Sequence, residues 1–276
     1  MNKRQQLFCF ILLLCLTGSV SAQTYHDVIN KAMDYTMKDS LEQAEQLFQE
    51  ALKMDPSNAR NALLFSNLGT VQKRMGKIDE AIKTYTIALN ITPYATSILL
   101  NRAALYLDKG LNDKAYVDYC NVIDLIPENT EARLFRAYIY MSRRQYDEAR
   151  VDYNVILNKE PQHKSARIGL VLLEQNLGKI TAAHNGLNLL INDYPEDTSL
   201  LKMRANLQLD QNFSDAALVD LETIAQLDPN DAENFCQIGE VYLRIHKKKE
   251  ALSAFEKAMA LGIPRVQLQK QLKACK

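Results

Sequence analysis

Residues 62–95 read ALLFSNLGTVQKRMGKIDEAIKTYTIALNITPYA, and the landmarks of this stretch return along the chain every 34 residues. The proline near its end is the first of five prolines at that spacing: Pro93, Pro127, Pro161, Pro195 and Pro229. The alanine in its middle starts a second series with the same period: Ala81, Ala115, Ala149, Ala183, Ala217 and Ala251. Two series with one period indicate an internal repeat, and this period is typical of an array of helix pairs.

Each repeat is predicted to hold two helices joined by a tight turn. The apolar residues of the second half follow helical spacing, as in Ala81, Tyr85 and Ala88. The turn residue is of a type that tolerates positive φ in six repeats, namely Asp39, Gly76, Gly110, Gly178, Asn212 and His246. Arg144 takes this place in the remaining repeat and is the one departure.

Polar residues near the predicted helix starts are interpreted as caps. Four aspartates just after the turns are predicted to cap the second helix of their repeat: Asp79, Asp113, Asp147 and Asp215. The prolines are predicted to end that helix. Four polar residues near the repeat boundaries are predicted to start the next first helix: Asn58, Asn129, Asp197 and Asp231.

Small residues mark the places where the two helices of a repeat approach closely. In the first helices these are Ala32, Gly69, Ala103, Ala137, Ala205 and Gly239. Val171 takes this place in the fifth repeat, so we expect that repeat to pack its helices more loosely.

These residues resemble the pattern of the tetratricopeptide-repeat family, which pairs Leu-Gly and Tyr in the first helix with Ala, Phe, Ala and Pro in the second. The matching residues of the quoted stretch are Leu68, Gly69, Ala81, Tyr85, Ala88 and Pro93. The resemblance implies an all-α fold, a right-handed α-solenoid of about seven repeats that ends in a capping helix. The predicted repeats are 25–58, 62–95, 96–129, 130–163, 164–197, 198–231 and 232–265, and the predicted capping helix is 266–276.

The composition agrees with a folded helical protein. The chain has 276 residues with 33 basic and 33 acidic side chains, and 47% of its residues are hydrophobic, which argues against a disordered chain and against a strongly basic nucleic-acid binder. Only 9 Gly and 7 Pro favour long helices over an all-β sandwich or barrel.

Residues 1–22 have the layout of a cleavable signal peptide. Lys3 and Arg4 precede the apolar run 7–16, and small residues end at Ala22. A membrane anchor is the alternative, but a spanning helix needs about 20 apolar residues. Lipidation is disfavoured because no small residue precedes Cys9 or Cys15. We therefore expect export, to the periplasm or, as the alternative, outside the cell, with 23–265 forming the solenoid and no membrane span in the mature chain.

The cysteines do not form a disulfide framework. The mature part holds only Cys120, Cys236 and Cys275, an odd and widely spaced set. A clip between Cys236 and Cys275 stays open beside the alternative of free thiols.

No catalytic or metal-binding motif occurs in the sequence, so we expect neither an enzyme nor a cofactor nor a metal site. The four histidines lie in different repeats and are interpreted as surface or turn residues: His26, His163, His184 and His246. The run Lys247-Lys248-Lys249 suggests an anionic partner, or else a solvated surface.

The family resemblance places certain first-helix positions in a concave groove. In the third to fifth repeats these residues form an apolar strip: Leu100, Ala104, Leu107, Leu134, Tyr138, Met141, Ile168 and Leu172. An exposed strip would mark a site for a peptide or helix, whereas tight curvature would bury it against the neighbouring repeats. A carboxylate clamp of the kind that some family members carry is incomplete here, because Lys202 and Asn206 lack the further basic residues.

The sequence thus predicts a non-catalytic scaffold whose partner is a protein or peptide of unknown identity, with no nucleic acid. The alternative is a structural adaptor in a cell-envelope assembly, which would use its convex face or its ends.

Overall fold

The structure is a computed structural model that describes residues 24–276, and these contain helices and turns but no strand. The predicted signal peptide, 1–22, lies outside the described residues. After a helix over residues 24–37, the helices are α2 (Leu41–Met54), α3 (Asn61–Arg74), α4 (Ile78–Ile91), α5 (Thr96–Asp108), α6 (Asn112–Leu125), α7 (Thr130–Ser142), α8 (Tyr146–Lys159), α9 (Lys164–Asn176), α10 (Ile180–Asp193), α11 (Thr198–Asp210), α12 (Ser214–Leu227), α13 (Ala232–Arg244), α14 (Lys248–Ala260) and α15 (Gln269–Ala274).

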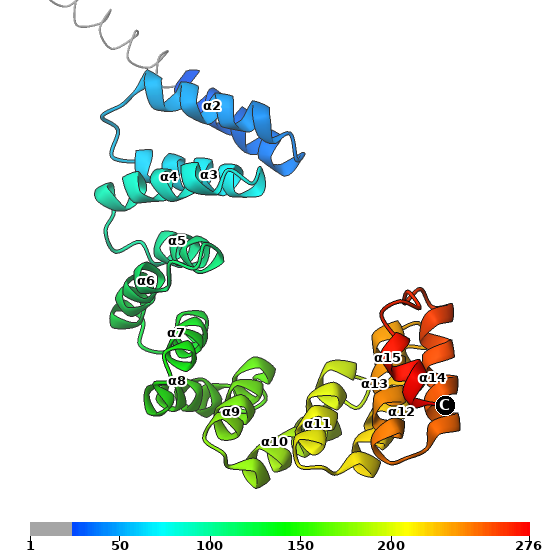
Figure 1. Cartoon of the computed structure of the whole chain (residues 1–276). Coiled ribbons are helices and arrows are strands. Elements are labelled where there is room, and N and C mark those ends of the chain that lie inside the picture. The colour runs from blue at the N-terminus through cyan, green and yellow to red at the C-terminus, as the bar shows by residue number, and fades with distance from the viewer. Residues whose placement is uncertain (1–23) are drawn as a thin grey trace, which may run out of the picture. The chain divides into compact units, whose positions relative to one another are not determined.

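Within each unit of the chain, consecutive helices pack as antiparallel pairs, as Figure 1 shows for α3 and α4 and for α13 and α14, and neighbouring pairs pack together, for example through α4 and α5 and through α12 and α13. The chain divides into two compact units, one up to Ile139 and one from Tyr140, and α7 crosses the border. Each unit has its own apolar core, in which the alanine series and the large side chain one helical turn later are fully buried. The predicted all-α repeat fold is therefore confirmed.

The turn between paired helices has the predicted backbone in every repeat. All seven turn residues have positive φ: Asp39, Gly76, Gly110, Arg144, Gly178, Asn212 and His246. Arg144 adopts φ 59° because its turn makes the same hydrogen bonds as the others, for example from Gln145 N to Tyr140 O at 2.8 Å, beside Lys77 N to Gln72 O at 2.9 Å. The turn geometry therefore overrides the preference of the side chain.

The close approaches between helices are filled by large side chains. A Cβ at Gly69 would lie 2.8 Å from Cε1 of Tyr85, so the ring of Tyr85 would have to shift to accommodate any other residue there. The prediction of loose packing at Val171 is wrong, because Gly186 on α10 has no Cβ and a Cβ there would lie 2.7 Å from Val171 Cγ2. In this repeat the small residue, Gly186, lies on the second helix and the larger one, Val171, lies on the first helix, which is the reverse of the other repeats. Val171 is buried.

The predicted caps of the second helices are also wrong. The N-cap of α4 is Lys77 and that of α12 is Phe213, neither makes a side-chain capping hydrogen bond, and Asp79 and Asp215 lie in the first turn. In the first turn their carboxylates stabilise the helix through the positive end of its dipole, and not by accepting a hydrogen bond from a backbone N–H.

Three of the four predicted first-helix caps are confirmed. Asp197 accepts a hydrogen bond from Ser199 N, Asp231 from Asn234 N and Asn129 from Ala132 N. The prediction for Asn58 is wrong, because Arg60 is the N-cap of α3 and Asn58 accepts its hydrogen bond from Arg60 N, ahead of the helix. A cap that the sequence analysis missed is His163, whose Nδ1 accepts a hydrogen bond from Ala166 N at 3.2 Å.

The C-terminal segment contains a helix shorter than expected. α15 has six residues and begins after a turn over 265–268. Leu268 of that turn is buried against Ala251, Phe255 and Ala258, and so covers the apolar end of the last repeat.

Candidate protein-binding surface

The predicted apolar strip is divided between the two units. Leu100, Ala104 and Leu107 lie on α5, while Leu134 and Tyr138 lie on the part of α7 that belongs to the N-terminal unit. The residues from the C-terminal unit are Met141, Ile168 and Leu172. Each unit thus carries part of the strip on its first helices.

The strip is a half-buried surface with two exposed side chains. Tyr138 is 59% exposed and Leu172 is 39% exposed. The other six residues are half-buried, and Leu100, Leu107 and Ile168 pack against the apolar cores of their units. The surface available to a partner is therefore centred on Tyr138 in the N-terminal unit and on Leu172 in the C-terminal unit.

Buried ion pairs fix the first helix α5 beneath this surface. Arg102 donates from Nε and Nη2 to both carboxylate oxygens of Asp118 at 2.8 and 2.7 Å, and from Nη1 to Thr86 Oγ1 at 3.0 Å. Burial would lower the pKa of Arg102, but the hydrogen bonds and charge of Asp118 raise it above its ordinary value. The guanidinium thus joins α5 to the second helix of its own repeat and to that of the preceding repeat.

The same arrangement fixes α11 in the C-terminal unit. Arg204 contacts both oxygens of Asp220 at 2.9 and 2.6 Å and also Asn188 Oδ1 at 2.8 Å. The sequence analysis missed these pairs, although the 34-residue period relates Arg102, Arg136 and Arg204, and likewise Asp118, Asp152 and Asp220.

Hydrogen bonds from or to amide side chains connect neighbouring first helices on their exposed faces, and also connect the last first helix, α13, to α15. Gln237 Nε2 donates to Asn206 Oδ1 at 2.9 Å, and Gln271 Nε2 donates to Glu240 Oε1 at 3.2 Å. In the N-terminal unit Lys73 donates to Asn101 Oδ1 at 3.3 Å. Because Asn206 is already used within the molecule, the structure gives no support to a carboxylate clamp on Lys202 and Asn206.

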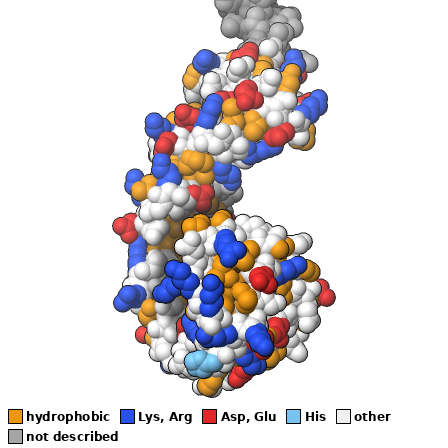
Figure 2. All heavy atoms as spheres, turned by 45° about the vertical axis from the view of Figure 1, so that its right-hand side comes forward, with side chains coloured by type: hydrophobic (Ala, Val, Ile, Leu, Met, Phe, Trp, Pro, Cys, Tyr) orange, Lys and Arg blue, Asp and Glu red, His pale blue; other side chains and the backbone are white. Residues whose placement is uncertain are grey.

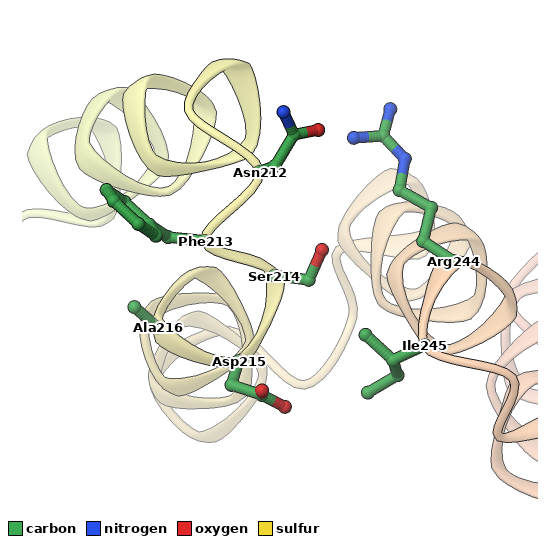
Figure 3. Close-up of a pocket in the computed structure, with 7 residues that line it drawn as sticks. All are labelled: Asn212, Phe213, Ser214, Asp215, Ala216, Arg244 and Ile245. Carbon is green, nitrogen blue, oxygen red and sulfur yellow. The ribbon is translucent and has the colours of Figure 1, made fainter.

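A pocket of about 720 Å³ lies between the start of α12 and the end of α13. Figure 3 shows Asn212 and Ser214 pointing across this pocket toward Arg244 and Ile245, while the ring of Phe213 points to the other side of the turn. Phe213 is 63% exposed. The pocket presents a guanidinium, an amide and a hydroxyl, which are groups suited to hold an anion or a polar chain.

The histidines and cysteines are dispersed. In residues 24–276 no three His, Cys, Asp or Glu side chains gather in a way that could hold a metal ion. The thiols of Cys236 and Cys275 are free, although both pack against the apolar cluster around Phe255. Burial raises the pKa of both thiols, which keeps them protonated and weakly nucleophilic.

No helix in the described part of the chain has the length and apolar character needed to cross a bilayer.

Comparison with known proteins agrees with this architecture. A family model described as "Tetratricopeptide repeat" matches residues 63–94. The chain is similar to a tetratricopeptide repeat protein from Parabacteroides merdae of known crystal structure, with 32% identity over 92% of this chain and 99% of that chain and a TM-score of 0.72. This similarity extends over nearly all of both chains.

Two further similarities are more limited. The human DnaJ homolog subfamily C member 7 is 39% identical over 66 residues, which are 24% of this chain and only 13% of the human protein. PilF of Pseudomonas aeruginosa is 17% identical, with 76% of this chain and 94% of that chain covered and a TM-score of 0.58, and it shares the fold alone.

Proposed function

Because the chain belongs to the tetratricopeptide-repeat family, we propose that it is a non-catalytic scaffold that binds a protein or peptide segment on the exposed faces of its first helices. The observation that carries the proposal is the exposure of Tyr138 beside the half-buried Leu134 on α7. Exposed aromatic side chains set in a rigid, partly apolar surface are typical of binding sites.

Apolar contact alone does not supply enough free energy for a partner to bind. Burying three such side chains contributes about 5–9 kcal/mol, whereas association costs about 4–15 kcal/mol. The partner must therefore add hydrogen bonds, and polar groups such as Ser97, Glu131 and Asn176 lie exposed on the same helices. An extended segment or a helix that matches both kinds of group fits this surface.

We also propose that the scaffold acts after export, in the cell envelope. The support is the layout of residues 1–22, with a basic start, a ten-residue apolar run and small residues at the end.

A second candidate function, a structural adaptor, uses the outer faces of the second helices. Several apolar residues there are strongly exposed, among them Val117, Val151, Leu189 and Val219, at 55% to 63%. They offer a different surface to a larger assembly.

Affinity capture from the native extract distinguishes the two surfaces. The test variant carries Tyr138→Glu and Leu172→Glu, because these are the two exposed residues of the strip and we expect a charge at these positions to leave the fold intact. The matched control carries Val117→Glu and Leu189→Glu on second helices. Circular dichroism and thermal unfolding confirm that both variants keep the helical structure.

We expect the unaltered chain and the control variant to capture the same polypeptide, and the test variant to lose it. Loss in the control alone would establish the adaptor instead, and retention by both variants would remove the first-helix surface from consideration.

A further inference from the structure

The positive charge of the chain is concentrated at its C-terminal end. Residues 244–276 contain nine Lys or Arg and two Glu, although the whole chain has equal numbers of basic and acidic residues. Uneven charge of this size steers the approach of partners and selects those of opposite sign.

Six of these basic residues form what we call the basic edge: Arg244, Lys247, Lys248, Lys249, Lys273 and Lys276. All six are exposed, and none forms an ion pair within residues 24–276. α15 packs on α14, and the charge of Lys248 acts on the pKa of the Cys275 thiol, which places the chain end beside the start of α14. Figure 2 shows Lys and Arg side chains gathered around apolar ones in its lower half, which holds the C-terminal unit.

The start of α14 is electrostatically unfavourable by itself. Lys247 is its N-cap residue, and Lys248 and Lys249 are its first two residues, ahead of Glu250. Cations are disfavoured at the positive end of a helix dipole. The other second helices carry no such lysine cluster at their starts, and in α14 Glu250 is the single acidic residue of the first turn beside the three lysines. An anionic partner would relieve the repulsion at α14, and sequences break such local rules chiefly at functional sites.

The pocket at the start of α12 is continuous with the basic edge, because Arg244 belongs to both. Arg244 and Asn212 face one another across the pocket, and Ser214 points between them (Figure 3). Asp215 also lines the pocket but points away from Arg244 in this view. A guanidinium, an amide and a hydroxyl together match the acceptor oxygens of one carboxylate.

We propose that the basic edge and this pocket dock an acidic segment of a partner polypeptide. One carboxylate lies in the pocket against Arg244, and further carboxylates lie along Lys247, Lys248 and Lys249. The pocket favours a polypeptide over a bilayer surface, since a side chain enters it and a flat layer of headgroups does not. This surface is separate from the one on which the proposed scaffold function rests.

The experiment measures binding of a fluorescein-labelled 12-residue peptide of Glu, Asp and Leu to the full chain by fluorescence anisotropy. The reference peptide has Gln and Asn in place of Glu and Asp. The test variants are Lys247→Gln/Lys248→Gln/Lys249→Gln and, separately, Arg244→Gln. The matched control removes three exposed lysines elsewhere, Lys31→Gln/Lys83→Gln/Lys159→Gln.

We expect the triple edge variant to raise the Kd for the acidic peptide at least tenfold and Arg244→Gln at least fivefold, with the control within twofold. Binding should weaken as salt rises and should be absent with the reference peptide. Tyr138→Glu/Leu172→Glu should bind the peptide normally, which separates this surface from the first-helix surface.

Equal loss in the edge variant and the control would overturn the proposal, because binding would then follow net charge alone. Binding to vesicles containing phosphatidylglycerol, or to duplex DNA, with no binding of the acidic peptide would also overturn it. A third outcome is that the chain does not bind the peptide but self-associates in sedimentation velocity, and that the edge variant abolishes this self-association. The occupant of the basic edge would then be a second copy of the chain, which would overturn the proposal.

Discussion

Arg102 and Asp118 hold two helices together by charge and hydrogen bonds, whereas the repeat pattern holds helices together by apolar contacts. Asp118 is buried and is held by two hydrogen bonds from one guanidinium. Breaking a buried pair leaves an uncompensated charge, whereas replacing both partners by apolar groups is often neutral. The pair therefore contributes mainly to fixing how α5 fits against α6 of its own repeat, while the bond from Arg102 to Thr86 connects α5 to the preceding repeat.

Asp118→Ala is expected to destabilise the chain by about 3–5 kcal/mol, because Arg102 then lies half-buried without a counter-ion. The double variant Arg102→Leu/Asp118→Leu should recover most of that loss. Urea unfolding followed by circular dichroism measures both, and a double variant as unstable as the single one would contradict this explanation.

The exchanged packing at Val171 and Gly186 gives a second residue-level test. Gly186→Ala should cost about 1–3 kcal/mol through overpacking, because its Cβ meets Val171 Cγ2. In a Val171→Ala background the same substitution should be neutral or favourable, since alanine is the better helix former. Additive effects in this double-mutant cycle would show that the two side chains do not compete for space.

The roles that could be predicted from the sequence belong to residues whose type is required by the local backbone conformation or by a close approach of two helices. Prolines, turn glycines and alanines at close approaches followed from local stereochemistry. The Arg–Asp pairs could not be derived in the same way, since two charged residues in separate helices give no local signal until the period aligns them. Gly186 was missed for a related reason, because its role depends on which of two helices provides the space.

At the scale of elements, helix starts depend on where the chain turns. The aspartates near the second helices were predicted as caps, yet those helices begin one or two residues earlier, at Ile78 in α4 for example. The first helices α11 and α13 start as predicted because their caps follow a proline-containing turn that fixes the position of the first residue.

Asp197 combines capping with an ion pair and makes the start of α11 sensitive to acid. Burial would raise the pKa of its carboxyl, but hydrogen bonds from Lys164 and Ser199 lower it to about 2 from an ordinary value of 3.8. The folded-state pKa is depressed, so this stabilisation is fully present above pH 4 and is lost as the pH falls from about 4 toward 2.

Asp197→Ala should therefore cost about 1 kcal/mol at pH 7 through loss of the cap. The difference in unfolding free energy between this variant and the unaltered chain should shrink as the pH falls through that window. A difference that stays constant between pH 5 and pH 2.5 would show that the charge of Asp197 has no part in stability.

At the scale of the whole molecule, a repeat array is held by contacts between neighbours, so damage at one end is felt most near that end. Leu268 covers the last repeat of the C-terminal unit and is buried, whereas Val266 beside it is exposed. The sequence indicated a capping segment, but the length of its helix depended on packing that no local pattern encodes.

Leu268→Ala should cost about 2–3 kcal/mol and raise hydrogen exchange in α13 and α14 but not in α3 and α4. Val266→Ala is the matched control and should change neither quantity. Equal effects of the two substitutions, or faster exchange throughout the chain, would contradict a neighbour-to-neighbour account.

How far the apolar strip is exposed could not be predicted from the sequence. Exposure depends on how closely successive repeats pack, and residues at equivalent first-helix positions differ widely, from the half-buried Ala104 to the exposed Tyr138 one repeat later. The position of a residue within the repeat indicates the face on which it lies, while its neighbours in the adjacent repeats determine how much of it a partner reaches.

The central claim is that partners bind on the first-helix faces. Tyr138 on the first helix α7 and Val151 on the second helix α8 are each 59% exposed, and they therefore form a matched pair. A photo-reactive amino acid placed at one or the other position, followed by irradiation of the native cells, tests the claim most directly. We predict a cross-linked polypeptide from position 138 and none from position 151, and a cross-link from position 151 alone would contradict the claim.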